Sequence, residues 1–118
     1  MASALLLRPL TMTIRYDHDE PDRAIVDDLP GPAVLEFGAD WCGHCQAAQP
    51  LIAAALGQHP EIQHLKIADG KGQPLGRSFG VKLWPTLVFL RDGQEVLRLI
   101  RPTDMASIAR GFDAIAAP

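Results

Sequence analysis

Cysteine is scarce in this chain of 118 residues, which contains only Cys42 and Cys45. So few cysteines exclude a disulfide-stapled scaffold, and a chain of this length can bury about 65% of its unfolded surface without such cross-links. An excess of basic residues is also missing. The 11 Lys and Arg residues are outnumbered by 14 Asp and Glu, for a net charge of −3, so the chain has no positive field with which to bind nucleic acid.

Long apolar runs are lacking near the start of the sequence as well. The run at residues 4–7 is too short for a signal peptide, has no basic residue before it, and leads into Arg8 and Pro9 without a small-residue cleavage site. We therefore expect no signal peptide, no membrane span and a cytoplasmic location. Residues 1–11 are expected to form a tail before a single domain at residues 12–118.

Apolar periodicity and turn residues predict the element order β-α-β-α-β-α-β-β-α. The predicted elements are a strand at 13–16, a short helix before Pro30, a strand at 33–38, a helix from Cys42 to about Leu56, a strand at 62–68, a short helix at 73–79, strands at 86–90 and 95–100 joined by a hairpin turn, and a last helix with Thr103 as its N-cap. The nearly continuous apolar run at 33–38 predicts a central strand that is buried on both faces.

The two cysteines have the spacing of a redox pair. If Cys42 opens a helix, Cys45 lies one turn further on, and the two sulfurs can close a disulfide. Unpaired N–H groups and the helix dipole at that end favour a thiolate on Cys42, whose pKa such motifs lower from about 8.5 into the range ~3.5–7.5. Cys42 is therefore the expected nucleophile, and Cys45 the thiol that resolves the mixed disulfide.

Other uses of the pair fit less well. A structural zinc site needs four ligands, usually with a second cysteine pair, and the chain has none, so we expect no metal. A haem attachment motif needs His after the second cysteine, where this chain has Gln46. An inert core pair is the remaining alternative, but the motif follows an apolar strand directly and places Gly43 beside the sulfur.

Glu36 interrupts the apolar strand at 33–38. An acid there either lies at an exposed strand end or is buried with a raised pKa for a purpose. Asp40, next to the cysteine motif, has the plainer interpretation of a solvated turn residue and is not expected to be catalytic.

The segment Trp41-Cys42-Gly43-His44-Cys45 after a buried strand, followed about forty residues later by Trp84-Pro85-Thr86, resembles the thioredoxin family over residues 14–116. The resemblance implies an α/β fold with a central mixed sheet of four to five strands flanked by helices. It implies that Pro85 is a cis proline facing the disulfide, the alternative being a trans proline that starts a strand. The backbone of Trp84 is then free to pair with an extended substrate.

The same resemblance gives roles to two charged residues. Glu36 falls where the family has a buried acid, usually Asp, and would take the proton of Cys45 through water. Lys66 falls where a lysine commonly neighbours that acid, and is either an exposed structural residue or one that tunes it. Trp41, Gly43, His44, Trp84 and Pro85 would form the substrate groove.

Three residues depart from the thioredoxin pattern. His44 stands where thioredoxins usually have Pro and makes the motif similar to that of protein disulfide isomerase, which predicts a potential above roughly −270 mV and toward roughly −180 mV. Arg101, in place of a small glycine loop, suggests with Lys82 a preference for acidic clients. Trp84 adds apolar area, so the client range is expected to be narrower than that of thioredoxin.

The expected function is thiol–disulfide exchange with protein disulfides, most often as a reductant. The domain needs no cofactor of its own. By the resemblance, electrons come from an NADPH-dependent flavin thioredoxin reductase, and the protein is expected to be a monomer without nucleic-acid or membrane partners. A non-catalytic adapter or chaperone for one client remains the alternative from another class.

Overall fold

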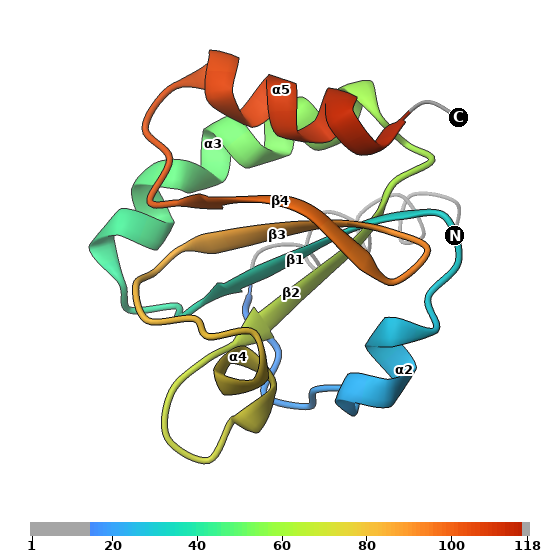
Figure 1. The fold of residues 1–118 in the computed structure, drawn as a ribbon. Helices are drawn as coiled ribbons and strands as arrows, with labels where there is room; N and C mark the ends of the chain where they lie inside the picture. Colours follow the sequence, from blue (N-terminus) through green and yellow to red (C-terminus); the bar gives the residue numbers. More distant parts are fainter. Residues whose placement is uncertain (1–14, 117–118) are drawn as a thin grey trace, which may run out of the picture.

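The sheet is mixed, and its most buried strand lies in the middle. A computed structural model describes residues 15–116, in which four strands have the order β2-β1-β3-β4 (Figure 1). Strand β1 (Pro32–Gly38) pairs in parallel with β2 (Gln63–Ala68) and antiparallel with β3 (Thr86–Arg91), which forms a hairpin with β4 (Gln94–Ile100). Because β1 is apolar on both faces, it occupies the interior, as its sequence predicts.

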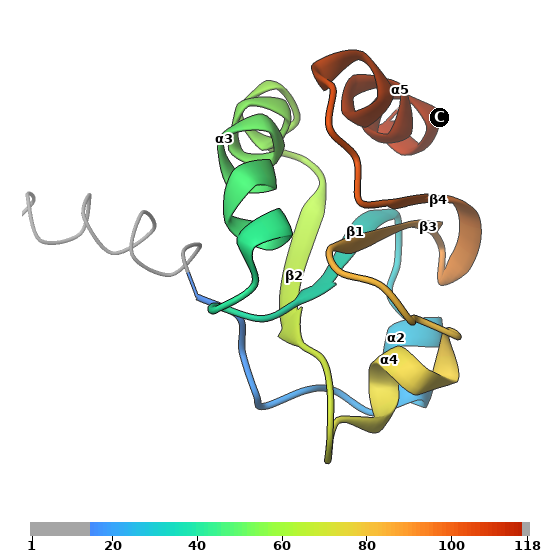
Figure 2. The ribbon, with the colours of Figure 1, turned by 90° about the vertical axis from the view of Figure 1, so that its left-hand side faces the viewer.

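Helices cover both faces of this sheet. Figures 1 and 2 show α3 (Gly43–Gln58) and α5 (Met105–Ala116) on one face, and the short α2 (Arg23–Asp27) and α4 (Pro74–Ser78) on the other. Alternate residues of β1 enter the two cores. Val34 packs with Ile52 and Phe112 below α3 and α5, whereas Leu35 packs with Val26 and Leu75 on the opposite face. The predicted fold class is confirmed.

The predicted strand at 13–16 and the predicted end of the helix that starts at the cysteine pair differ from the structure. The predicted strand at 13–16 lies partly outside the described residues, and the described chain makes only an isolated parallel bridge from Asp17 to Ile67. The Asp17 carboxylate accepts the amide of Asp19, which turns the chain after one bridge. Helix α3 continues through Gly57 to Gln58.

The last helix begins at Met105, and its N-cap is Asp104 rather than the predicted Thr103. The Asp104 carboxylate accepts both the amide of Ser107 at 2.8 Å and its hydroxyl at 2.9 Å. These hydrogen bonds hold the pKa of Asp104 below its usual range. Asp104 therefore caps α5, because its charged side chain reaches the third amide of the helix.

Helix α5 approaches the sheet closely at a glycine. A Cβ at Gly111 would lie 2.5 Å from the ring of Phe89 on β3, a ring that also packs edge-on against Phe112 at 5.2 Å between centroids. Since Phe89 and Phe112 are fully buried, neither ring has room to retreat.

Replacing this glycine tests the close approach. Gly111→Ala should lower the free energy of unfolding by about 1–3 kcal/mol through overpacking. Gly57→Ala is the matched control, because a Cβ there meets nothing within 4 Å, and alanine should stabilise α3 by roughly 0.5 kcal/mol. Urea unfolding of both variants measures the difference, and two effects of the same sign would contradict this packing.

Candidate active site

The cysteine pair lies at the N-terminal end of α3. Cys42 is the N-cap residue, and its Sγ accepts the backbone amide of Cys45 at 3.2 Å. Both cysteines are free thiols and largely buried. The hydrogen bond and the helix dipole favour a negative sulfur at Cys42, so the predicted nucleophile has the predicted surroundings.

Cys45 has the opposite environment. Burial, together with the hydrogen bond and charge of Cys42, raises the pKa of the Cys45 thiol to about 11, although hydrogen bonds with the Ala39 backbone and Tyr16 act against this shift. Cys45 is therefore protonated near neutral pH. It can attack a mixed disulfide only after it loses that proton.

Glu36 lies fully buried beneath the pair. Its Oε2 accepts the Tyr16 hydroxyl at 2.5 Å and the Gln49 amide at 2.9 Å. On the other side, Oε1 lies 2.9 Å from His64 Nε2, which must carry a proton because a carboxylate can only accept. Burial favours the neutral carboxyl, but these bonds and the charge of His64 hold the pKa of Glu36 below its ordinary value. The expected raised pKa is therefore wrong.

Three partners of Glu36 escaped the sequence analysis. Gln49 follows Cys45 by four residues on the same helix face, a spacing that could have revealed it, and its amide also donates to the Cys45 carbonyl at 2.9 Å. His64 lies on β2 beside Lys66, the register partner of Glu36. Tyr16 lies in a connector 20 residues before Glu36, and no sequence pattern near it indicated that it would contact the acid.

Lys66 is buried, with 8% of its surface exposed, which excludes the alternative of an exposed structural lysine. Its Nζ donates to Gln49 Oε1 at 2.5 Å and lies 4.8 Å above the Tyr16 ring. Burial lowers the pKa of Lys66 more than the charges of Glu36, Asp40 and Cys45 raise it. Lys66 thus acts on Glu36 through Gln49 and through its charge.

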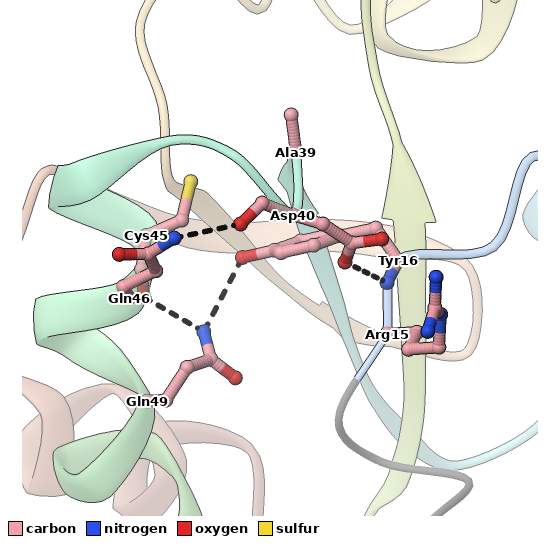
Figure 3. Close-up of a pocket in the computed structure, with 7 residues that line it drawn as sticks. All are labelled: Arg15, Tyr16, Ala39, Asp40, Cys45, Gln46 and Gln49. Atoms are coloured by element: carbon pink, nitrogen blue, oxygen red, sulfur yellow. Dashed lines mark hydrogen bonds between the residues drawn. The ribbon is translucent and has the colours of Figure 1, made fainter.

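A pocket of about 310 Å³ opens beside Cys45 and Tyr16. Figure 3 shows its lining, with Gln49 directed toward the Tyr16 hydroxyl, 3.4 Å away. Asp40 is exposed, as predicted, and its carboxylate accepts the amide of Tyr16 at 2.9 Å. Asp40 therefore anchors the connector that carries the tyrosine.

Aromatic residues form the rim on the other side of the pair. Trp41 is 76% exposed and packs edge-on against Trp84 at 5.5 Å, and the Trp84 indole donates to Asp69 at 2.8 Å. The bond between Trp84 and Pro85 is cis, which confirms that prediction and excludes the trans alternative. Gly43 and His44 are exposed in the first turn of α3, next to the reactive sulfur.

Arg101 lies against Trp84 and Pro85 at the rim. Its φ is +51°, the left-handed region that favours glycine. Its amide donates to the Pro85 carbonyl and its Nε to the Trp84 carbonyl, both at 2.8 Å. The expectation that the Trp84 backbone is free is therefore wrong for this carbonyl.

The described part of the chain shows neither a cluster of metal ligands nor a helix that could span a membrane. No three His, Cys, Asp or Glu side chains among residues 15–116 gather to hold a metal ion. No helix of that segment has the length and apolarity needed to cross a bilayer.

A dithiol with one nucleophilic and one resolving sulfur exchanges two electrons with disulfides, which is the chemistry of a thiol–disulfide oxidoreductase.

Comparison with known proteins gives the same result. The Thioredoxin family model matches residues 15–114. The thioredoxin of Chlamydia muridarum is 33% identical over 81 residues, which cover 68% of this chain and 78% of that protein. The chain belongs to the thioredoxin family, and it is a thiol–disulfide oxidoreductase.

Two further relatives show how the similarity is distributed. The structure of thioredoxin 2 from Pseudomonas aeruginosa PAO1 in its reduced form has a TM-score of 0.79 and 54% identity, covering 86% of this chain and 94% of that chain. Protein disulfide-isomerase A2 of Pongo abelii is 49% identical over 67 residues, 52% of this chain. The chain spans only 13% of that isomerase's length.

The buried carboxylate predicts a pH dependence of stability. Because the pKa of Glu36 is lower in the folded state, its contribution is complete above the unfolded value of 4.5 and is lost as the pH falls through the folded value. As the pH falls, Glu36→Gln should therefore lose less free energy of unfolding than the unaltered protein does. The difference between the two slopes should be at most about 1.4 kcal/mol per pH unit.

Urea unfolding between pH 6 and pH 3, roughly the range over which carboxyl groups titrate, measures this slope. Glu95→Gln is the control, since Glu95 is also lowered in pKa, by its hydrogen bond with Arg98, but lies at the surface. A Glu36→Gln slope equal to that of the unaltered protein would contradict the assignment of a buried carboxylate.

Proposed function

We propose that this chain reduces disulfides in client proteins. The Cys42 thiolate attacks one client sulfur, the client disulfide breaks, and a mixed disulfide forms. Cys45 then attacks the Cys42 sulfur, and the client leaves as a dithiol that has gained two electrons. The observation that carries the proposal is the free pair itself, with Cys42 accepting an amide at the helix end and Cys45 held as a buried thiol. No feature of residues 15–116 favours a redox-silent adapter.

Replacing each cysteine by serine should affect a different step of the reaction. Cys42→Ser should reduce insulin disulfide reduction, with dithiothreitol as electron donor, to the uncatalysed background, because no nucleophile remains. Cys45→Ser should accumulate a covalent adduct with insulin, visible by mass spectrometry and released by reductant. Glu95→Gln, at the surface, is the control for handling. Full activity of Cys42→Ser would contradict catalysis by this pair.

The electron donor, the cellular location and the oligomeric state are part of the same proposal. The oxidised pair is returned to the dithiol by an NADPH-dependent flavin thioredoxin reductase, as the family relationship suggests. A cytoplasmic location is supported by the use of just two cysteines at C-x-x-C spacing, which is typical of redox proteins in a reducing compartment. The protein acts as a monomer.

The client surface follows from the rim. Arg101 and Lys82 are exposed, and Arg101 lies against the Trp84 carbonyl. Positive charge there favours clients with acidic residues near the disulfide, mainly by faster association. The exposed Trp41 and its partner Trp84 add apolar contact. The client range is therefore narrower than that of a general reductant.

In this proposal, His44 sets the reduction potential of the Cys42–Cys45 pair. It is exposed in the first turn of α3 and shares a small pocket of about 110 Å³ with Arg101 and Pro102. A donor or cation between the two cysteines stabilises the Cys42 thiolate, and therefore the reduced form of the pair.

Replacing His44 tests this role. His44→Pro should lower the reduction potential toward roughly −270 mV, a shift of about 30 mV being a tenfold change in the equilibrium constant. Equilibration with a glutathione series, with the dithiol fraction measured by alkylation, gives the potential. An unchanged potential would contradict the role of His44, and Ala47→Ser, one turn along α3 on the same small pocket, controls for substitution in this region.

A further inference from the structure

The hydroxyl of Tyr16 is a buried polar group beside the thiol of Cys45. Both atoms converge on Gly38, where a Cβ would lie 2.6 Å from Cys45 Sγ and 2.8 Å from the Tyr16 hydroxyl oxygen. Glycine at this position leaves the space in which sulfur and hydroxyl meet. Tyr16, Cys45 and Cys42 also belong to one buried cluster.

The hydroxyl contacts Glu36 on its other side. Its oxygen lies 2.5 Å from Glu36 Oε2, and Gln49 donates to the same carboxylate oxygen at 2.9 Å. A hydroxyl has one proton to donate and lone pairs to accept, so Tyr16 can accept from the Cys45 thiol while it donates to Glu36. Hydrogen bonds can therefore run from the Cys45 thiol through the Tyr16 hydroxyl to Glu36, that is, from the resolving sulfur to the buried acid.

We propose that Tyr16 is a catalytic residue that carries the proton of Cys45 to Glu36 in the resolving step. The inference rests on the proposed reduction of disulfides. It replaces the water expected between Cys45 and Glu36 by a fixed side chain of the protein.

Atoms and electrons balance in this step. The Cys45 thiol gives its proton to the Tyr16 oxygen, and Tyr16 gives its own proton to Glu36 Oε2. The Cys45 thiolate attacks the Cys42 sulfur of the mixed disulfide, the bond between Cys42 and Cys45 forms, and the client sulfur leaves with the electron pair of the broken bond. The proton on Glu36 exchanges later with solvent.

The two proton movements have to be coupled. Burial, the charge and hydrogen bond of Glu36, and those of Cys45 all raise the pKa of Tyr16 far above its usual range. A free tyrosinate is therefore excluded as an intermediate, and Tyr16 can only gain one proton while it loses the other. Reversal of both hydrogen bonds leaves Tyr16 donating to the Cys45 thiolate and accepting from Glu36.

The mixed disulfide makes this transfer easier than it is in the free dithiol. Two of the causes that raise the pKa of Cys45 are the hydrogen bond and the charge of Cys42. Both depend on Cys42 as a free sulfur and disappear when Cys42 is bonded to a client. The hydrogen bond that Tyr16 donates to the Cys45 thiolate once the protons have moved, which lowers the pKa of Cys45, does not depend on Cys42. The surroundings therefore release the proton when the client is bound.

The other charged groups around the chain hold the acid in place. His64 faces the second oxygen of Glu36, and Lys66 reaches it through Gln49. Both are positioning residues, because their hydrogen bonds run to Glu36 and to Gln49. Asp40 anchors the backbone of Tyr16 and adds a negative charge near Lys66.

Reaction with 5,5′-dithiobis(2-nitrobenzoate) separates the two steps. Attack by Cys42 releases the first thionitrobenzoate at a rate proportional to reagent concentration, and attack by Cys45 releases the second at a rate independent of it. Tyr16→Phe, which keeps the ring, should slow the second phase about 100-fold and raise its pH midpoint, because general acid–base groups contribute on the order of 10²–10⁴-fold. The first phase, which Cys42 carries out, should change less than about twofold.

A double variant distinguishes the relay from a loss of packing. Glu36→Gln should slow the second phase as Tyr16→Phe does, and the variant with both substitutions should be no slower than the slower single one, because the groups act as a unit. Effects that multiply, or a second phase in Tyr16→Phe within about twofold of the unaltered protein, would overturn the relay. Absence of both phases in the unaltered protein would instead overturn the proposed function.

Discussion

The negative charge of Glu36, placed between the central strand and α3, is the constraint on which the site depends. A carboxylate removed from water is costly unless every oxygen is satisfied. Here the donors come from three separate parts of the chain: the connector with Tyr16, helix α3 with Gln49, and strand β2 with His64. Satisfying one buried charge therefore also fixes where α3 begins relative to the sheet, and with it the positions of both sulfurs.

The two thiols differ because the fold gives them different surroundings within a single helical turn. Cys42 lies at the cap, where an amide and the helix dipole favour negative charge. Cys45 faces inward, where burial keeps the proton on sulfur. A shared environment would leave both sulfurs equally nucleophilic, and a mixed disulfide could form on either. The asymmetry gives the exchange an order, with attack first and resolution second.

Local pattern predicted much of this structure, and long-range contact accounts for the remainder. The buried strand at 33–38 and the helix starting at the cysteine pair have signals within a few residues, whereas the cis bond before Pro85 was implied by the resemblance to the thioredoxin family. The ionised state of Glu36 has none, because it depends on Tyr16 and His64, 20 and 28 residues away. The sequence left Lys66 open between an exposed and a tuning residue, and its burial likewise involves long-range contacts, with Gln49 and with the Tyr16 ring.

In the function proposed above, Arg101 has a consequence for how a client strand would bind. The Trp84 carbonyl already accepts the Arg101 side chain, so a client amide that pairs with this carbonyl competes with an existing partner. The exchange replaces one hydrogen bond by another and therefore contributes little net free energy. Affinity for a client must then come from side-chain contacts rather than from backbone pairing alone. A client segment that has no hydrogen-bond acceptor for the displaced Arg101 guanidinium gains the least affinity. In the proposed function, Arg101 in its left-handed position would therefore favour clients whose side chains contact the rim over clients that offer backbone pairing alone.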